Sequence, residues 1–462
     1  MAKVAIVFGA AVVAAFHGLC GTGGVASVVL NGPGDGVTLE SAALQRAIDE
    51  VSAAGGGTVV VPKGKHLVAQ VCLKSGVTLR LERDAVLLAS TNHVDYAAHD
   101  PVWPVAGEIA VLAAKGAKDI AVEGEGKIDG RGGACGRREA CGYHNGAVNR
   151  WRLIHFIDCT DVRVEGIRLE ESNLWVSFYE CCRRVTLRNL TIRSQANFNN
   201  DGIDLEVADA VVENCDIDSD DDAICFKSHH PEFVCSNVVV RNCRIASHCN
   251  CIKFGTATYG IFRDIDVHDC TLHTRRSPGL RDWRHWPAVD SRDWAIAGIA
   301  VEMVDGGQLE QVKVRDITVK NGVICPLFVR LGTRAKRSAA LQPGPSFLRD
   351  VLIENLRWES DSPASAARLP IILSGVPGHA IENLTLRNVS VPYVMAARRG
   401  DEKRKPKERA KAYPEAFMFG RLPAWGIYAR HIRGLSLENV DLRLVEGPEK
   451  RKKMLFNDVT QR

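Results

Sequence analysis

The sequence predicts an all-β fold, a single-stranded right-handed parallel β-helix with a helix covering its N-terminal end. Short alternating β-runs recur along the chain, each followed by a polar bend residue and a further apolar pair. The bend residues of the early repeats are separated by 23, 25, 28 and 27 residues; they are Gly166, Asn189, Asn214, Asn242 and Asp269. Coils of this length bury one strand face against their neighbours, and Asn at the bend accepts the left-handed backbone conformation that the turn needs. A large antiparallel sandwich is the alternative, but the hairpin dipeptides that it needs are scarce.

A helix is expected ahead of the coils, over about residues 39–53. The segment LESAALQRAIDEVSA is amphipathic, and the Gly-rich stretch after it ends the helix before a first strand closed by Pro62-Lys63-Gly64. In this position the helix would cover the open end of the solenoid, which otherwise exposes strand edges and core.

Two segments interrupt the repeats and are expected to form loops. Residues 274–295 carry Trp283, Trp286 and Trp294 beside Arg and His, a composition suited to stacking on sugar faces at a cleft wall. A packed surface flap is the equally acceptable alternative. Residues 396–413 are strongly basic and predict a solvated, mobile excursion.

Length and charge limit the classes of function. One main domain over residues 27–462 is expected of the 462-residue chain, because a solenoid grows without a new core. The formal charge of +4 is slight and no basic stripe with interleaved aromatics is present, which argues against a nucleic-acid partner. After the first turns of the chain, no apolar run reaches the ~20 residues of a membrane span. We expect a monomer without a cofactor, and no metal-binding spacing of the CxxC…CxxC kind occurs.

The N-terminus has the pattern of a secretory signal peptide, residues 1–26. Lys3 supplies the charged start, VAIVFGAAVVAAF the apolar segment, and Gly24-Val25-Ala26 the small residues for cleavage. The pattern predicts a secreted or periplasmic protein that is not held in a membrane after cleavage. The alternatives are a buried first helix and an uncleaved anchor.

Five of the 15 cysteines occupy positions that indicate their state. Cys215, Cys243 and Cys270 follow the bend residue of successive repeats, where the pattern needs an inward apolar side chain, so we expect free thiols there. Cys135 and Cys141 share one loop and are candidates for a disulfide, with two free thiols as the equal alternative.

Two acidic segments on neighbouring coils indicate a catalytic site. NFNNDGIDLE, residues 197–206, and DSDDDAICFKS, residues 218–228, place Asp201, Asp221 and Asp222 where their side chains can converge on one cleft. Like charges a few Å apart raise at least one pKa, which keeps one carboxyl as a proton donor beside another that stays ionised. The segments therefore predict an enzyme that acts on glycosidic bonds.

Together these segments resemble a known family. The motifs resemble those of glycoside hydrolase family 28, the polygalacturonase family of pectin-degrading enzymes. In chain order they are the N-terminal segment GDGVTLESAALQRAIDEVSAAGGGTVVVPKG, then IDGRG, RLIHFIDCTDVRVEGIRLEESNLW, NNDG, DDAICFKS and a His on the next coil. The resemblance covers residues 28–335, with weaker coils afterwards. It implies a right-handed β-helix of the pectin lyase-like kind.

The resemblance also implies an inverting hydrolase in which Asp221 is the general acid and Asp201 and Asp222 hold the attacking water. Strands of adjacent coils lie ~4.8 Å apart, and the side-chain directions set the final gap between the carboxyls. An inverting mechanism needs ~6.5–9.5 Å between them and a retaining one ~5–5.5 Å; we expect inversion. Asp220, directly before the pair, either tunes the acid by repulsion or is a solvated turn carboxylate.

Three further residues are expected at this cleft. His248 lies in Ser247-His248-Cys249, where the family has Gly-His-Gly, and about one coil after Asp222; there it would hydrogen-bond a carboxylate or a sugar hydroxyl. A structural histidine is the alternative, since the flanking glycines are missing. Lys227 would neutralise the acidic cluster, and Asn199 of NNDG would contact the substrate.

One departure from the family bears on the substrate. Polygalacturonases carry an Arg-Ile-Lys motif that binds the uronate carboxylate, and the matching stretch GIAVEMVDGG has Ala300 and Glu302 instead. Lys253 or Arg330 would then supply the cation, or the substrate is a neutral or mixed sugar such as a rhamnose-containing pectin branch. For Glu302, acceptance of a substrate hydroxyl and a simple charge on the rim are both open.

We therefore expect a glycoside hydrolase that acts on a pectic or related polysaccharide or oligosaccharide. A Ca²⁺-dependent polysaccharide lyase is one alternative, although the spacing of the acidic segments fits hydrolysis better. An inactive carbohydrate-binding β-helix is the other; loss of the Arg-Ile-Lys motif agrees with it and retention of all three aspartates does not.

Overall fold

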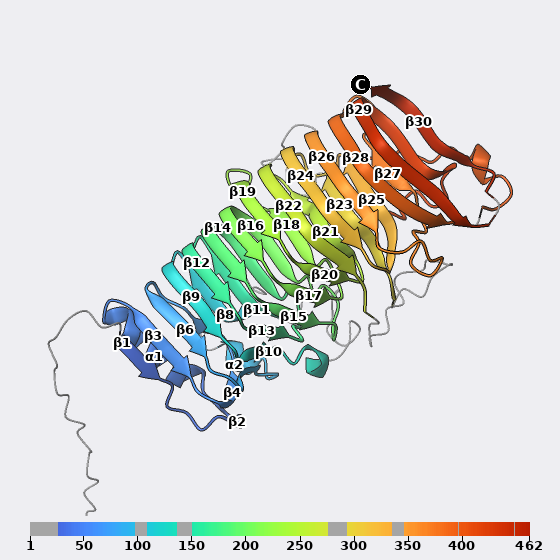
Figure 1. The fold of residues 1–462 in the computed structure, drawn as a ribbon. Helices are drawn as coiled ribbons and strands as arrows, with labels where there is room; N and C mark the ends of the chain where they lie inside the picture. The colour runs from blue at the N-terminus through green and yellow to red at the C-terminus, as the bar shows by residue number, and fades with distance from the viewer. Residues whose placement is uncertain are drawn as a thin grey trace, which may run out of the picture.

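The structure, a computed structural model, describes residues 26–97, 109–135, 150–275, 293–334, 346–395, 397–447 and 449–462. Within these ranges 30 strands form one long parallel array, and the molecule is an elongated right-handed β-helix (Figure 1). The predicted fold class is confirmed. No helix of the described residues is long and apolar enough to cross a bilayer.

Strand lengths range from two residues in β5 to 23 in β29, and the longer strands bend from one side of the coil to the next. They are β1 (Ala26–Val29), β2 (Asp35–Leu39), β3 (Gly57–Val61), β4 (Gly64–Val68), β5 (Val71–Cys72), β6 (Val77–Leu81), β7 (Ala85–Ala89), β8 (Ile109–Lys115), β9 (Lys118–Gly124), β10 (Lys127–Asp129), β11 (Trp151–Ile157), β12 (Thr160–Glu165), β13 (Arg168–Glu170), β14 (Ser177–Arg188), β15 (Thr191–Ser194), β16 (Ile203–Glu213), β17 (Asp216–Ser219), β18 (Ile224–Ser228), β19 (Val234–Arg241), β20 (Arg244–Ser247), β21 (Asn250–Thr258), β22 (Ile261–His273), β23 (Ala295–Met303), β24 (Gln308–Val319), β25 (Val323–Leu331), β26 (Phe347–Trp358), β27 (Ile371–Ser374), β28 (Ile381–Val394), β29 (Ala424–Glu446) and β30 (Lys452–Gln461). The helices are α1 (Ser41–Ala53) and α2 (Val94–Ala97), with 3-10 turns at Gly132–Cys135 and Asp401–Lys403.

Each strand pairs in parallel with the strand one coil away, so the strands stack in three ladders. The first ladder begins β1–β3–β6–β9–β12, and the second begins β2–β4–β7–β10–β13. The third runs β5–β8–β11–β14–β16–β18–β21–β23–β25–β27–β29. This third ladder carries the candidate site on its outward face.

The bends between ladders have the backbone conformation that the repeats predicted. Gly166, Asn189, Asn214, Asn242 and Asp269 all have positive φ, between 53° and 78°. Asn and Asp tolerate this left-handed region because a short polar side chain forms local hydrogen bonds there. The repeat register read from the sequence is therefore confirmed at these positions.

Inward side chains of the coils form one continuous apolar core. In β16, Ile203 and Leu205 point into it while Asp204 and Glu206 alternate on the other face. The successive thiols at positions 215, 243 and 270 are buried in this core and free, as the sequence predicted. The suggested Cys135–Cys141 bridge lies outside the residues that can be described.

Helix α1 covers the N-terminal end of the solenoid, as predicted (Figure 1). Its buried face consists of Leu44, Ala47, Ile48 and Val51, which join the same core. The helix contacts the first strands of the coil, so the end of the core is closed to water.

The basic segment after residue 396 has mostly exposed side chains, as the predicted solvated excursion would, but hydrogen bonds also tie it to the third ladder. Most of its cations are exposed, but Asp401 is buried and accepts hydrogen bonds from the Arg398 backbone N–H and from the Arg404 and Arg421 guanidinium groups. Backbone carbonyls of the segment accept further hydrogen bonds from Arg430. The segment 397–423, which we call the C-terminal loop, therefore packs onto the third ladder; most of the other predicted loop, residues 276–292 with Trp283, lies outside the described residues.

Candidate active site

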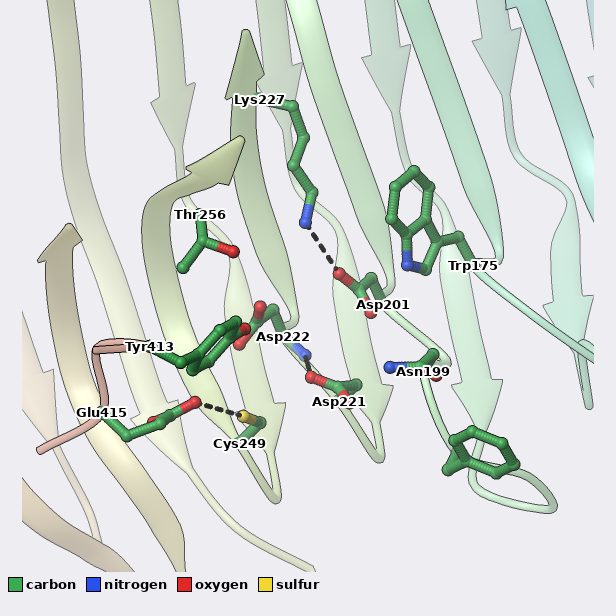
Figure 2. A pocket seen from close by; sticks show the side chains of 11 residues that line it. Trp175, Asn199, Asp201, Asp221, Asp222, Lys227, Cys249, Thr256, Tyr413 and Glu415 are labelled. Atoms are coloured by element: carbon green, nitrogen blue, oxygen red, sulfur yellow. Dashed lines mark hydrogen bonds and ion pairs between the residues drawn. The ribbon is translucent and has the colours of Figure 1, made fainter. Parts of the chain in front are cut away.

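A pocket opens on the outward face of the third ladder, at the ends of β16, β18 and β21 (Figure 2). Its volume is about 300 Å³, at the small end of the range for ligand sites. It is lined by Trp175, Phe198, Asn199, Asp201, Asp221, Asp222, Lys227, Cys249, Thr256, Tyr413 and Glu415. The three predicted aspartates therefore lie in one pocket.

Asp201 precedes β16 and is almost completely buried. Oδ2 of Asp201 lies 3.1 Å from Nζ of Lys227, and the same ammonium lies 3.3 Å from Oδ1 of Asp204. Burial raises the pKa of Asp201 to about 7; Lys227 opposes this rise, and Asp221 and Asp222 add to it. Asp201 is thus a carboxyl poised to exchange a proton near neutral pH.

Asp222 is buried to the same degree but has stronger cationic support. Its Oδ2 lies 3.0 Å from Nζ of Lys253, and its Oδ1 accepts a hydrogen bond of 2.8 Å from Asn250 Nδ2. Burial alone would raise the pKa of Asp222, but Lys253, Lys227 and Asn250 outweigh burial and hold the pKa below its usual range. Asp222 therefore stays ionised beside a neighbour that titrates near neutrality, which is the divergence expected of paired catalytic carboxyls.

Asp221 is the more accessible carboxyl of the three and lies at the pocket wall (Figure 2). Its Oδ1 accepts a hydrogen bond of 3.0 Å from the backbone N–H of Asp222. That bond fixes the side chain at the turn into β18, where it faces the same space as Asp201 and Asp222. A carboxyl in this place can reach an oxygen of a bound ligand, while the two deeper carboxyls are held by lysines.

Lys253, Glu302 and Arg330 do not lie where a carboxylate of the substrate would meet them. Lys253 is buried between Asp222 and Glu302, whose Oε2 is 3.5 Å away. Glu302 is fully buried, so neither acceptance of a substrate hydroxyl nor a charge on the rim describes it; burial raises its pKa well above the usual value, and Lys253 opposes that rise. Arg330, one coil further, is buried and donates to Ser374 Oγ and the Glu408 carbonyl.

His248 is buried behind the pocket and is not among the lining residues. Nε2 of His248 lies 2.7 Å from the Arg275 carbonyl oxygen, and Nδ1 lies 3.7 Å from Oδ1 of Asp220. Asp220 is fully buried, so its interpretation as a solvated turn carboxylate is wrong. The backbone N–H of His248 donates to the Ser219 carbonyl, and Ser247 Oγ donates to the Asp221 carbonyl, so this segment can position the turn that carries Asp221.

The remaining predicted residues, Asn199 and Lys227, both line the pocket. Asn199 has a φ of 52° and its Oδ1 accepts a hydrogen bond of 3.3 Å from Arg150 Nη1. The ammonium of Lys227 lies 4.7 Å from the ring centre of Trp175, which forms one wall. An aromatic wall beside hydrogen-bonding groups suits the apolar face and hydroxyls of a sugar ring.

The opposite side of the pocket comes from residues that the sequence did not single out. Tyr413 and Glu415 reach it from the C-terminal loop, and Oε1 of Glu415 lies 3.8 Å from Sγ of Cys249 (Figure 2). Glu415 and Cys249 are 166 residues apart in the chain, so no local pattern relates them. Trp175 had a local signal, since it ends the segment RLIHFIDCTDVRVEGIRLEESNLW that supports the family resemblance.

Three groups of potential metal ligands occur among the described residues, each with ligand atoms within 4.8 Å of one another. Two of the groups include aspartates of the pocket; there the ammonium of Lys227 contacts Asp201 and Asp204, and the ammonium of Lys253 contacts Asp222. The third consists of Cys181, Glu206 and His230; Glu206 accepts from the His230 backbone N–H and pairs with His229.

Comparisons with known proteins relate the chain to one family of glycosyl hydrolases. Residues 52–277 match the family model of Glycosyl hydrolases family 28. A probable polygalacturonase of Vitis vinifera is 26% identical over 310 residues, which are 63% of this chain and 60% of that protein; the match thus spans less than two thirds of the relative. Two solved structures have the same fold at 18% identity. An exopolygalacturonase of Thermotoga maritima has a TM-score of 0.66, covering 90% of this chain and 92% of that one, and a family 28 exopolygalacturonase of Yersinia enterocolitica has 0.68, covering 94% and 77%.

Proposed function

We propose that this chain, whose residues 52–277 match the model of glycosyl hydrolases family 28, hydrolyses glycosidic bonds of a pectic or related polysaccharide with inversion at the anomeric carbon. The observation that supports this most directly is the convergence of Asp201, Asp221 and Asp222 on one pocket. The three carboxyls differ in burial and in cationic support, so they can take different roles in one reaction.

In the proposed reaction, Asp221 donates a proton to the leaving glycosidic oxygen. Its accessible position at the pocket wall allows it to reach that oxygen. Asp201 and Asp222 hold a water on the opposite face of the sugar. Asp201 takes the proton of that water, since a base with a pKa of about 7 accepts a proton and is still ionised in a useful fraction near neutrality. Water then attacks the anomeric carbon as the bond to the leaving oxygen breaks, which inverts the configuration.

Positive charge in the pocket supports hydrolysis over the Ca²⁺-dependent lyase alternative. Lys227 and Lys253 each contact two carboxyl groups, among them Asp201 and Asp222 of the pocket, so these two acids have protein cations as partners. A lyase would instead direct several carboxylates toward one metal position. The alternative of an inactive binder predicts a pocket without differentiated carboxyls, whereas Asp201 and Asp222 have pKa values displaced in opposite directions.

The test is a screen of acidic and neutral pectic oligosaccharides in a buffer with EDTA. The proposal predicts new reducing ends in the absence of Ca²⁺, and one-dimensional proton NMR should show the inverted anomer first. An ultraviolet-absorbing unsaturated product would indicate a lyase. No change in any oligosaccharide, with binding retained, would indicate a binding protein.

Export to the periplasm or the medium is part of the proposal, supported by the apolar segment near the N-terminus. Expression of the full chain in a bacterial host tests it. N-terminal sequencing of the exported protein should place the cleavage near Ala26. Recovery of the intact chain in the cytoplasm only would contradict export.

A further inference from the structure

We infer that Cys181, Glu206 and His230 form a binding site for a divalent transition metal, Zn²⁺ in preference to Ca²⁺ or Mg²⁺. Cys181 belongs to β14, Glu206 to β16, and His230 follows β18; these strands are neighbours in the third ladder (Figure 1). None of the three is among the described residues that line the pocket, so the site is separate from the proposed catalytic groups. The bound metal would join three successive coils and stabilise them.

The donor atoms of the site are a thiol sulfur, a carboxyl oxygen and an imidazole nitrogen, and they lie within 4.8 Å of one another. Zinc bonds to such atoms are ~2.0–2.3 Å long, so small rotations of the side chains suffice to bring all three onto one ion. Sulfur and imidazole ligands favour Zn²⁺, whereas Ca²⁺ and Mg²⁺ are bound by oxygen atoms. No short motif in the sequence predicts this site, because each coil contributes one ligand.

Glu206 is the fully buried ligand of the three. Its Oε1 accepts a hydrogen bond of 2.9 Å from the backbone N–H of His230, which ties the segment after β18 to β16. Its Oε2 has no hydrogen-bond donor among the described residues, and Nδ1 of His229 lies 3.4 Å from it. A buried carboxylate oxygen without a donor is costly, and a bound cation would remove that cost.

Cys181 is placed differently from most of the cysteines. Among those that the structure describes, only Cys72 and Cys181 are half-buried, and the others are buried. Cys181 has a φ of 54°, and the register of β14 on β16 shifts between Glu180 and Cys182. Cys181 is thus left out of the strand pairing, as in a β-bulge, and its sulfur lies beside Glu206 and not in the core.

His230 has a carboxyl group near each ring nitrogen. Nε2 lies 2.7 Å from Oε1 of Glu180, and Nδ1 lies 3.6 Å from Oε1 of Glu232. Metal-bound histidines usually donate their other ring N–H to a carboxylate or a carbonyl, which fixes the orientation of the ring. Either nitrogen of His230 can therefore bind the metal while a carboxylate holds the other.

Metal binding has to displace protons from two of the ligands. Burial and the nearby acids, Glu206 first among them, raise the pKa of the Cys181 thiol, and the hydrogen bond to Glu180 raises the pKa of His230 to about 9. Zn²⁺ binds as the thiol and the imidazolium each release one proton to the solvent. The side chain of His230 is 38% exposed, so water can reach a fourth position on the ion.

Titration of the full chain with Co²⁺ tests the site. The protein is reduced with a phosphine, freed of metal with EDTA and transferred to metal-free buffer. We expect one equivalent of Co²⁺ to produce a thiolate-to-cobalt charge-transfer band, and Zn²⁺ to displace Co²⁺, since Zn²⁺ binds such ligands more tightly. Absence of the band at a tenfold excess of Co²⁺, or its loss on addition of an equal concentration of Ca²⁺, would overturn the inference.

Two cysteine variants locate the thiolate ligand. Cys181→Ser should remove the charge-transfer band. Cys72→Ser, at the other half-buried cysteine of the described residues, is the matched control and should leave the band as in the parent. A band that survives in Cys181→Ser, or that is lost to the same extent in both variants, would contradict the assignment of Cys181.

The carboxyl ligand is tested with an isostere. Glu206→Gln retains an acceptor for the backbone N–H of His230 but removes the negative charge, so Co²⁺ should bind at least about tenfold more weakly. Glu359→Gln, at an exposed acid that pairs with Lys320, is the control and should change the affinity less than about twofold. Equal affinities of Glu206→Gln and the parent would show that Glu206 is not a ligand.

The stability of the fold gives a second readout. A metal that binds only the folded chain stabilises it, so excess Zn²⁺ should raise the Tm of the parent by about 2 °C or more and change that of Cys181→Ser by less than about 1 °C. Circular dichroism in EDTA checks that both proteins have the same fold without metal. An equal rise of Tm in both would place the effect of Zn²⁺ elsewhere and contradict the site. Hydrolysis plays no part in these measurements, so their outcome is independent of the proposed function.

Discussion

Nζ of Lys253 lies 3.0 Å from Oδ2 of Asp222, and the two residues lie on neighbouring coils. This contact keeps the buried carboxyl of Asp222 ionised in the pocket. The stacking of β18 on β21 creates the contact, because each coil places its outward side chains beside those of the next. The electrostatics of the site are thus a direct consequence of the solenoid register.

Replacement of Lys253 should disable the site. In Lys253→Met, Asp222 loses its main cationic partner and its pKa rises, so less of it is ionised to hold water. We expect kcat to fall about 100-fold or more, within the range for loss of a group that supports proton transfer. Steady-state kinetics on the substrate found in the screen measure this, and circular dichroism checks the fold. A folded variant with kcat within about threefold of the parent would contradict the role of the contact.

Replacement of Lys227 should move the pH profile in a defined direction. Lys227 lowers the pKa of Asp201, which burial has raised to about 7, so Lys227→Met should raise that pKa further. Because the proposed base acts only when deprotonated, kcat/KM of the parent should increase with pH through about 7, and the variant should need a higher pH.

The matched control for this profile is Lys320→Met, since Lys320 is an exposed lysine that pairs with Glu359 on the surface. Its kcat/KM profile should coincide with that of the parent. An acidic limb that stays in place in Lys227→Met, or moves to lower pH, would be incompatible with Asp201 as the base.

The packing of the C-terminal loop should depend on the carboxylate of Asp401. Burial disfavours the charged carboxylate, but hydrogen bonds from Arg421, the Arg398 backbone and Arg404 outweigh burial and lower its pKa to about 2. The folded-state pKa is therefore below the unfolded value, so this contribution to stability is present above about pH 4 and is lost as the pH falls toward 2.

Asp401→Asn should weaken these charge-assisted bonds by about 1–3 kcal/mol. Because the loop carries Tyr413 and Glu415, we expect faster proteolytic cleavage within residues 397–423 and a higher KM. Limited proteolysis with mass spectrometry measures the first effect. Glu402→Asn in the same loop is the control, and an identical cleavage rate in the two variants would show that Asp401 does not hold the loop.

The left-handed bends between strands should tolerate Gly better than Ala. Asn242 has a φ of 55°, so Asn242→Ala should lower the free energy of unfolding by about 1 kcal/mol, whereas Asn242→Gly should be nearly neutral because Gly adopts this conformation without a Cβ penalty. Denaturant unfolding of both variants measures the difference. Greater stability of the Ala variant would contradict the left-handed bend.

The architecture could be predicted because its determinants are local. Alternating apolar residues and bend residues such as Asn189 and Asn214 repeat in every coil, and each coil needs little beyond its neighbour. The shared pocket of Asp201, Asp221 and Asp222 followed from the same register, since the segments that carry them occupy successive coils.

The parts of the site that could not be predicted depend on contacts between segments that are distant in the sequence. Tyr413 and Glu415 enter the pocket only because buried Asp401 and the carbonyls of its loop find arginine donors, and a basic, irregular sequence does not reveal these partners. The burial of Glu302 was equally hidden, because it depends on neighbours in adjacent coils, Lys253 on one side and Arg330 on the other.

The proposed role of Asp221 is to donate the proton in a site assembled from three carboxyls of neighbouring coils. Its most direct test is kcat/KM of Asp221→Asn on the preferred oligosaccharide, beside Asp209→Asn, an exposed aspartate in a coil of the same region. Asp221→Asn should lose nearly all turnover, at least about 100-fold, with an unchanged fold and retained binding, while Asp209→Asn stays near the parent. Activity of Asp221→Asn within about tenfold of the parent would contradict the assignment.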